Sequence, residues 1–201
     1  MKYMDVKKEI EYRKEIMQLL YEGKKIEKSD REWLVTHPIY IEEEGFLLLK
    51  KDVIKVPVNE DFQVKVELVA NNSKHKISPL FVIPLKKGSI HCEYNIKDTS
   101  GAVLKGKQIT VLSTCNSDKN PVCTFHCFSK SGLLGVLFEC ETKDHRGVRY
   151  MMDSTVATQL VMKKTVITAN KIQYSCSDIE NKEIDKYVFT VEWNHWNTME
   201  I

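Results

Sequence analysis

The sequence lacks a strong net charge. Its 201 residues include 30 Lys and Arg against 28 Asp and Glu, for a formal net charge of +2. A balance of this kind creates no field that would attract nucleic acid or an anionic membrane surface. The chain also has no run of 18 apolar residues and no apolar core of a secretory signal near Met1. We therefore expect a cytoplasmic protein that binds neither nucleic acid nor membrane, with its six cysteines as reduced thiols.

The usual sequence signatures of enzymes are missing as well. There is no G-x-G-x-x-G loop, Walker loop, serine elbow or H-E-x-x-H motif. The segment with Cys115, Cys123 and Cys127 has one close cysteine pair, whereas zinc ribbons and fingers use two. On a strand, Cys123 and Cys127 would lie about 13 Å apart on one face and His126 on the other. We predict buried thiols here, no metal site and no cofactor.

Two other arrangements of reactive side chains have simpler explanations. His91 precedes Cys92, but neighbours in a strand point to opposite faces and cannot form a dyad by adjacency. Glu139 and Glu141 would stand about 7 Å apart on one strand face, a separation compatible with an inverting glycosidase. A solvated outer face of a sheet explains the same two carboxylates. An enzyme whose site is assembled only by the fold stays open as a third hypothesis.

What the sequence does contain begins with an amphipathic helix over residues 3–22. Its charged side chains form helix-spaced pairs, and Gly23 stands where a left-handed C-terminal cap is expected. A shorter helix is predicted from Ser29, which can cap it together with Glu32, to the region before Pro38. The apolar stripe of the first helix, interrupted by Arg13, consists of Tyr3, Val6, Ile10, Met17 and Leu20.

From about residue 46 onward, short runs alternate apolar and polar side chains, the period of a half-buried strand. Turn-prone residues separate these runs, and no helix between them is long enough for a parallel crossover. We therefore predict an antiparallel β-sandwich, jelly-roll or immunoglobulin-like, in residues 39–201 and a helical segment in residues 1–38. The predicted strands are 46–50, 53–57, 62–70, 80–85, 89–96, 103–113, 122–129, 134–143, 148–152, 170–176 and 186–193.

Three local patterns refine this prediction. Pro79 and Pro84 remove backbone donors, so the strand between them is expected at a sheet edge. The run of acidic residues 42–44 before Gly45 predicts a solvated turn. In residues 155–169 the first half stays unassigned, whereas residues 165–168 suit a strand.

The candidate functional residues all belong to binding surfaces. Ile10, Arg13 and Met17 lie on the helix stripe, whose apolar side chains must pack on the sheet or on another molecule. His145 and Arg146 occupy a predicted hairpin tip, and Trp196 falls outside the last strand's alternation. We predict a non-enzymatic intracellular protein that binds a protein partner or self-associates through its N-terminal helix. The alternative is a carbohydrate-binding module of an exported protein that uses Trp196.

Overall fold

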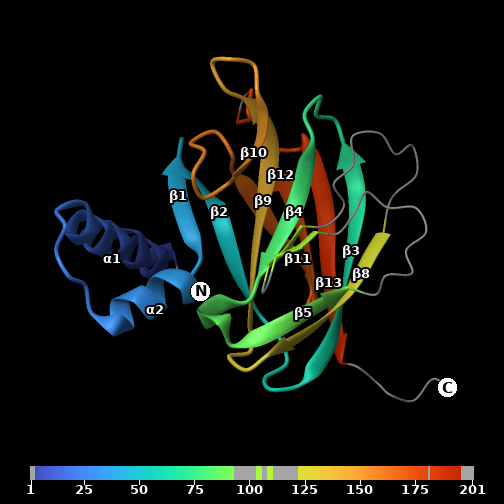
Figure 1. Cartoon of the computed structure of the whole chain (residues 1–201), viewed down its shortest axis with the longest axis horizontal. Coiled ribbons are helices and arrows are strands. Elements are labelled where there is room, and N and C mark those ends of the chain that lie inside the picture. The colour runs from blue at the N-terminus through green and yellow to red at the C-terminus, as the bar shows by residue number, and fades with distance from the viewer. Residues whose placement is uncertain (1–2, 93–102, 106–107, 111–121, 181, 196–201) are drawn as a thin grey trace.

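The computed structural model describes residues 3–92, 103–105, 108–110, 122–180 and 182–195. Within them two helices precede a mainly β body, as Figure 1 shows. Trp196, Cys115 and the turn-prone residues 98–101 and 116–120 between predicted strands lie outside the described residues.

Helix α1 (Tyr3–Tyr21) matches the predicted amphipathic helix almost residue for residue. Its end has the expected geometry: Gly23 has φ +70°, and the amides of Gly23 and Lys24 donate to the carbonyls of Leu20 and Leu19. Helix α2 (Lys28–Thr36) also forms, but the predicted serine cap was wrong. The helix begins after Glu27 without a side-chain cap, and Ser29 lies inside its first turn.

The described part of the body is built from strands. They are β1 (Ile39–Glu43), β2 (Phe46–Lys55), β3 (Asp61–Asn71), β4 (Ile77–Val82), β5 (Gly88–Cys92), β6 (Val103–Lys105), β7 (Gln108–Thr110), β8 (Val122–Ser129), β9 (Leu133–Lys143), β10 (Arg149–Asp153), β11 (Met162–Thr168), β12 (Lys171–Cys176) and β13 (Tyr187–His195). A 3-10 turn, η1 (Pro84–Lys86), follows β4.

The described strands pair in the order β5-β8-β3-β13-β12-β11-β2-β9-β4-β7-β6, with β1 beside β2 and β10 beside β9. Every pair is antiparallel, as the short connections predict. Strand β2 pairs with β1 and β11 over its first half and with β9 over its second half. The strands therefore form one curled sheet, a half-barrel that does not separate clearly into the two sheets of a sandwich (Figure 1).

The hydrophobic core fills the inside of this curl. The alternation predicted for β3 is confirmed, because Phe62, Val64 and Val66 are completely buried. The two arms of the curled sheet, one containing β4 and the other containing β8, meet across the core. The rings of Phe81 in β4 and Phe125 in β8 lie 5.1 Å apart there. Burial of these large side chains supplies much of the driving force for folding.

Three strand predictions were wrong in informative ways. Segments 46–50 and 53–57 are one strand, β2, because the polar pair Lys51 and Asp52 interrupts the alternation without ending the strand. Strand β4 is not an edge strand: it pairs with β9 along its length and with β7 beyond Pro79. The predicted strand 103–113 contains the antiparallel pair β6 and β7.

Strand β1 was missed altogether. The acidic run at residues 42–44 predicted a turn, but Glu42 and Glu43 belong to β1 and pair with β2. Only Glu44 and Gly45 form the hairpin turn, with φ values of +50° and +81°. Positive φ at both central residues is the backbone that a tight two-residue hairpin requires.

Candidate functional site

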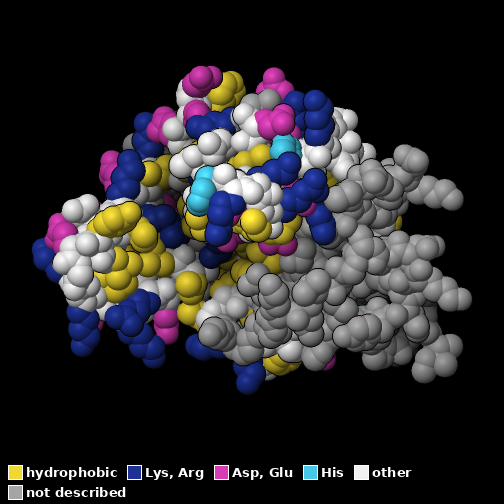
Figure 2. All heavy atoms as spheres, turned by 45° about the horizontal axis from the view of Figure 1, so that its top comes forward, with side chains coloured by type: hydrophobic (Ala, Val, Ile, Leu, Met, Phe, Trp, Pro, Cys, Tyr) yellow, Lys and Arg dark blue, Asp and Glu magenta, His cyan; other side chains and the backbone are white. Residues whose placement is uncertain are grey.

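Helix α1 buries some of its apolar side chains and leaves others exposed. On its inner side Val6 and Ile16 are buried, at 5% and 2% exposure. Further along the helix Met17 and Leu20 keep 43% and 40% of their surface exposed. Figure 2 shows hydrophobic side chains gathered at this helical end of the molecule. The predicted apolar stripe is therefore only partly used by the chain itself.

A groove of about 220 Å³ lies between α1 and the start of β1. It brings together three residues predicted from the sequence as binding residues, Ile10, Arg13 and Met17. The sequence did not identify the opposite wall, because β1 was not predicted. Together with those three residues, the groove is lined by Glu9, Lys14, Pro38 and Tyr40.

Arg13 explains why a cation interrupts the apolar stripe. Its guanidinium donates to the carbonyl oxygens of Leu34, His37 and Pro38 at 3.2–3.3 Å. It also lies 5.1 Å from the ring centre of Trp33. The last carbonyls of a helix have no partner within the helix and attract cations, so Arg13 fastens α1 to the end of α2. Carbonyl oxygens of the same chain are therefore the partners of this guanidinium.

A second cation reaches the same helix end from the sheet. Lys51 on β2 is buried, and its ammonium donates to the carbonyl of Val35 at 2.7 Å. Burial, reinforced by the positive charge of Arg13, lowers the pKa of Lys51 to about 8. The C-terminal end of α2 is thus held by one cation from α1 and another from β2.

Beneath the groove lies a buried carboxylate. Asp52, 1% exposed, accepts a hydrogen bond from the Tyr174 hydroxyl at 2.6 Å and an ion pair from Lys164 at 2.7 Å. Burial first, and then the negative charges of Asp52 and Glu9, raise the pKa of Tyr40 to about 12. Tyr40 therefore keeps its proton at physiological pH and offers the groove a neutral phenol.

One acceptor at the groove lacks a hydrogen-bond partner. Oxygen Oε2 of Glu9 is buried without a hydrogen-bond partner among the described residues. The groove combines apolar walls from Ile10 and Met17 with that single unsatisfied acceptor. Such a surface is suited to holding an apolar side chain with a hydrogen-bond donor beside it.

The other predicted binding residues lie elsewhere. His145 and Arg146 are exposed at the turn between β9 and β10. Asp144 accepts hydrogen bonds from the amides of Arg146 and Val148 at 2.8 and 2.9 Å, so turn geometry accounts for this segment. Trp196 falls outside the described residues.

The cysteines and carboxylates considered as reactive groups are explained by burial or by ion pairing. Cys123 and Cys127 are buried on the core face of β8, as predicted. Burial raises the pKa of the Cys140 thiol to about 12, which keeps it protonated and unreactive. On β9, Glu141 forms an ion pair with Arg149 of the neighbouring strand at 3.3 Å. Within the described ranges, no group of three or more His, Cys, Asp or Glu side chains is placed to hold a metal ion.

No family model, curated protein or solved structure matches this chain. In the described part of the chain, neither helix has the length and apolar character needed to cross a membrane.

Proposed function

We propose that this protein acts by binding another protein through the groove between α1 and β1 and the exposed side of α1 at Met17, Leu20 and Tyr21. The observation that carries the proposal is the exposure of Met17 and Leu20 on a helix that buries Val6 and Ile16. Tyr21 beside them is 87% exposed. Adjacent exposed apolar side chains on one helix are typical of an interaction surface.

The size of the groove defines how a partner would engage it. A volume of about 220 Å³ suits one large apolar side chain of the partner, held between Ile10, Met17 and Tyr40. A backbone or side-chain N–H next to that anchor would satisfy Oε2 of Glu9. The rest of the partner would cover Leu20 and Tyr21, and burial of each such side chain contributes about 1.5–3 kcal/mol when complete.

The proposed setting is intracellular and the proposed role is non-enzymatic. Four described cysteines, Cys123, Cys127, Cys140 and Cys176, take no part in a disulfide, the usual state of cysteine in a reducing compartment. The alternative of a carbohydrate-binding module depended on Trp196 and gains no supporting contact from the described residues. The same holds for an enzyme assembled by the fold.

The test compares two neighbouring positions on α1. Met17→Asp places a charge in the groove, and Gln18→Asp places the same charge on the adjacent exposed position. A photoreactive phenylalanine derivative at position 20 would crosslink the bound partner in the native cell, and mass spectrometry would identify it. Sedimentation of the purified protein at several concentrations would show whether the partner is a second copy.

We expect a specific crosslinked product that disappears with Met17→Asp and persists with Gln18→Asp, while both variants keep their melting temperatures close to that of the wild type. The proposal fails if both variants crosslink the same product. It also fails if Met17→Asp unfolds the isolated protein, because the helix face would then belong to the core.

A further inference from the structure

A second, larger cavity lies at the other end of β1, apart from the α1 groove. Its volume is about 560 Å³, within the range of roughly 300–1,000 Å³ typical of small-molecule sites. One wall comes from the β1–β2 hairpin and the other from the connection between β12 and β13. The lining residues are Glu43, Glu44, Phe46, Leu48, Lys182, Glu183 and Ile184.

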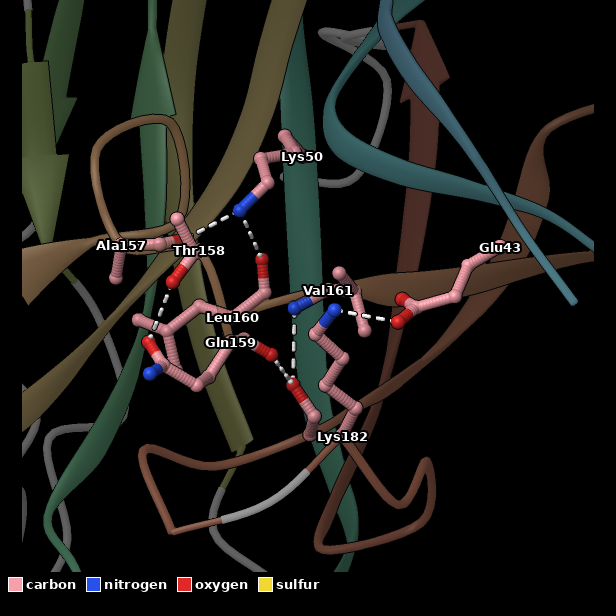
Figure 3. Close-up of polar contacts among 9 residues, drawn as sticks. Glu43, Lys50, Ala157, Thr158, Gln159, Leu160, Val161 and Lys182 are labelled. Atoms are coloured by element: carbon pink, nitrogen blue, oxygen red, sulfur yellow. Dashed lines mark hydrogen bonds and ion pairs between the residues drawn. The ribbon is translucent and has the colours of Figure 1, made fainter.

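Polar contacts hold the two walls in place. Glu43 of β1 forms an ion pair with Lys182 of the opposite wall, as Figure 3 shows. Beside this ion pair, the Lys50 ammonium donates to the carbonyls of Ala157 and Leu160, which fastens the neighbouring loop to β2. Contacts that exist before a ligand arrives reduce the ordering cost of binding.

The cavity offers an aromatic surface to a ligand. Phe46 lines it and keeps 68% of its surface exposed, whereas Leu48 beside it is buried. The face of an aromatic ring attracts apolar groups, other rings and organic cations. A ligand in the cavity would therefore pack against the exposed ring of Phe46.

The charges of the lining favour a cation. The lining carries three carboxylates and one ammonium; Glu183 is paired with Lys186 at 2.7 Å, so Glu43 and Glu44 provide the negative charge for a ligand beside Lys182. Lys182 binds Oε1 of Glu43, whereas Oε2 of Glu43 is buried without a hydrogen-bond partner among the described residues. An unsatisfied buried carboxylate oxygen is costly, and an N–H donor from a ligand would relieve that cost.

We propose that this cavity binds an organic amine with an apolar or aromatic body, whose ammonium group donates to Glu43 and whose body packs against Phe46. This site is independent of the protein-binding surface on α1. It would make the protein a receptor for a small cationic molecule or for the equivalent basic side chain.

The first experiment uses 2-phenylethylammonium as the probe, titrated into the full chain and followed by amide chemical shifts. The neutral isostere 2-phenylethanol is the matched control. We expect saturable shifts at residues 43–48 and 182–186 with the amine, and at least about tenfold weaker binding of the alcohol, the loss expected for one charge-assisted hydrogen bond. Equal affinity for the two compounds, or shifts centred on other residues, would overturn the proposal.

Two variants separate the ligand contact from the ion pair. Glu43→Gln and Lys182→Met both break the Glu43–Lys182 pair, but only Glu43→Gln removes the carboxylate. We expect Glu43→Gln to weaken amine binding about tenfold or more, and Lys182→Met to preserve or strengthen it. Phe46→Ala, at an exposed position, should keep the fold and weaken binding. Equal losses in Glu43→Gln and Lys182→Met, or undiminished binding in Phe46→Ala, would contradict the assignment.

Discussion

Large apolar side chains are buried inside the curled sheet but remain exposed near the end of α1. Phe81 and Phe125, on the two arms of the sheet, are fully buried, whereas Met17 and Leu20 on α1 stay about two-fifths exposed. The sheet curls so that each inward-facing residue meets another, but α1 is covered only where α2 and β1 reach it. Apolar character alone does not decide burial, because an opposing surface has to be present.

The same contrast applies to two neighbouring charges on β2. Asp52 has a cation and a hydroxyl as partners, whereas within the described ranges the one hydrogen bond of the Lys51 ammonium goes to the carbonyl oxygen of Val35. A buried charge without an opposite charge is strongly disfavoured, and the lowered pKa of Lys51 is the consequence. The helical end of the molecule therefore contains the less satisfied groups, and each of the following measurements tests that difference.

The largest effect is expected in the core. Phe125→Ala removes a ring that packs against Phe81 across the curl, so the free energy of unfolding should fall by about 3–5 kcal/mol. Urea denaturation measures this change. Val122→Ala, at the exposed start of the same strand, should cost less than about 1 kcal/mol. Similar losses in both variants would remove the distinction between covered and uncovered positions of β8.

Adjacent residues on α1 should differ nearly as much. Ile16→Ala should lower the free energy of unfolding by about 2–5 kcal/mol because the side chain is buried. Met17→Ala should change it by no more than about 0.5 kcal/mol. Thermal and urea unfolding of the two variants give the comparison. A large loss with Met17→Ala in the isolated protein would place the whole stripe in the core.

Arg13→Met should destabilise the helical end moderately. The variant leaves carbonyl oxygens of Leu34, His37 and Pro38 without their donor, at a cost of about 1–3 kcal/mol. The exposed Arg31→Met on α2 is the control, with an expected change within about 0.5 kcal/mol. If urea denaturation gives equal values for the two variants, Arg13 does not fasten the helices together.

The last expected effect is a pH dependence of stability. Lys51 has a pKa of about 8 in the folded protein against 10.5 for the ordinary side chain. Between these values the unfolded chain binds more protons, so this residue makes the free energy of unfolding rise with pH across that window. Lys51→Met should lack this rise, whereas the exposed Lys55→Met should retain it. Urea denaturation from about pH 7 to about pH 10 tests this, and a constant difference between Lys51→Met and wild type contradicts it.

Sequence patterns predicted most of the elements because those patterns are local. The period of β3 and β8 assigned their buried faces correctly, and the glycine after α1 predicted the end of the helix. The errors came where pairing overrides local chemistry. Acidic residues were accepted in β1 because its neighbour β2 supplies hydrogen bonds, and Pro79 was accepted in β4 because β7 pairs only beyond it.

In the candidate site, too, the local pattern was predicted and the contacts between distant segments were not. The sequence identified Ile10, Arg13 and Met17 as one stripe, and the structure places all three in one groove. Its opposite wall, Pro38 and Tyr40, and the unsatisfied oxygen of Glu9 depend on how β1 lies against α1. These features could not be derived from periodicity, which says nothing about which distant segments become neighbours.

By itself, the sequence determined that the chain has an amphipathic helix followed by antiparallel strands with one apolar face each, because spacing along the chain sets which side chains share a face. The tertiary structure decided that the strands join into one curled sheet, with β2 linking its two parts. It also decided which apolar side chains of α1 stay exposed, and it brought residues 43–48 beside residues 182–184 to form a cavity. Burial and cavities arise between surfaces far apart in sequence, so only the folded chain specifies them.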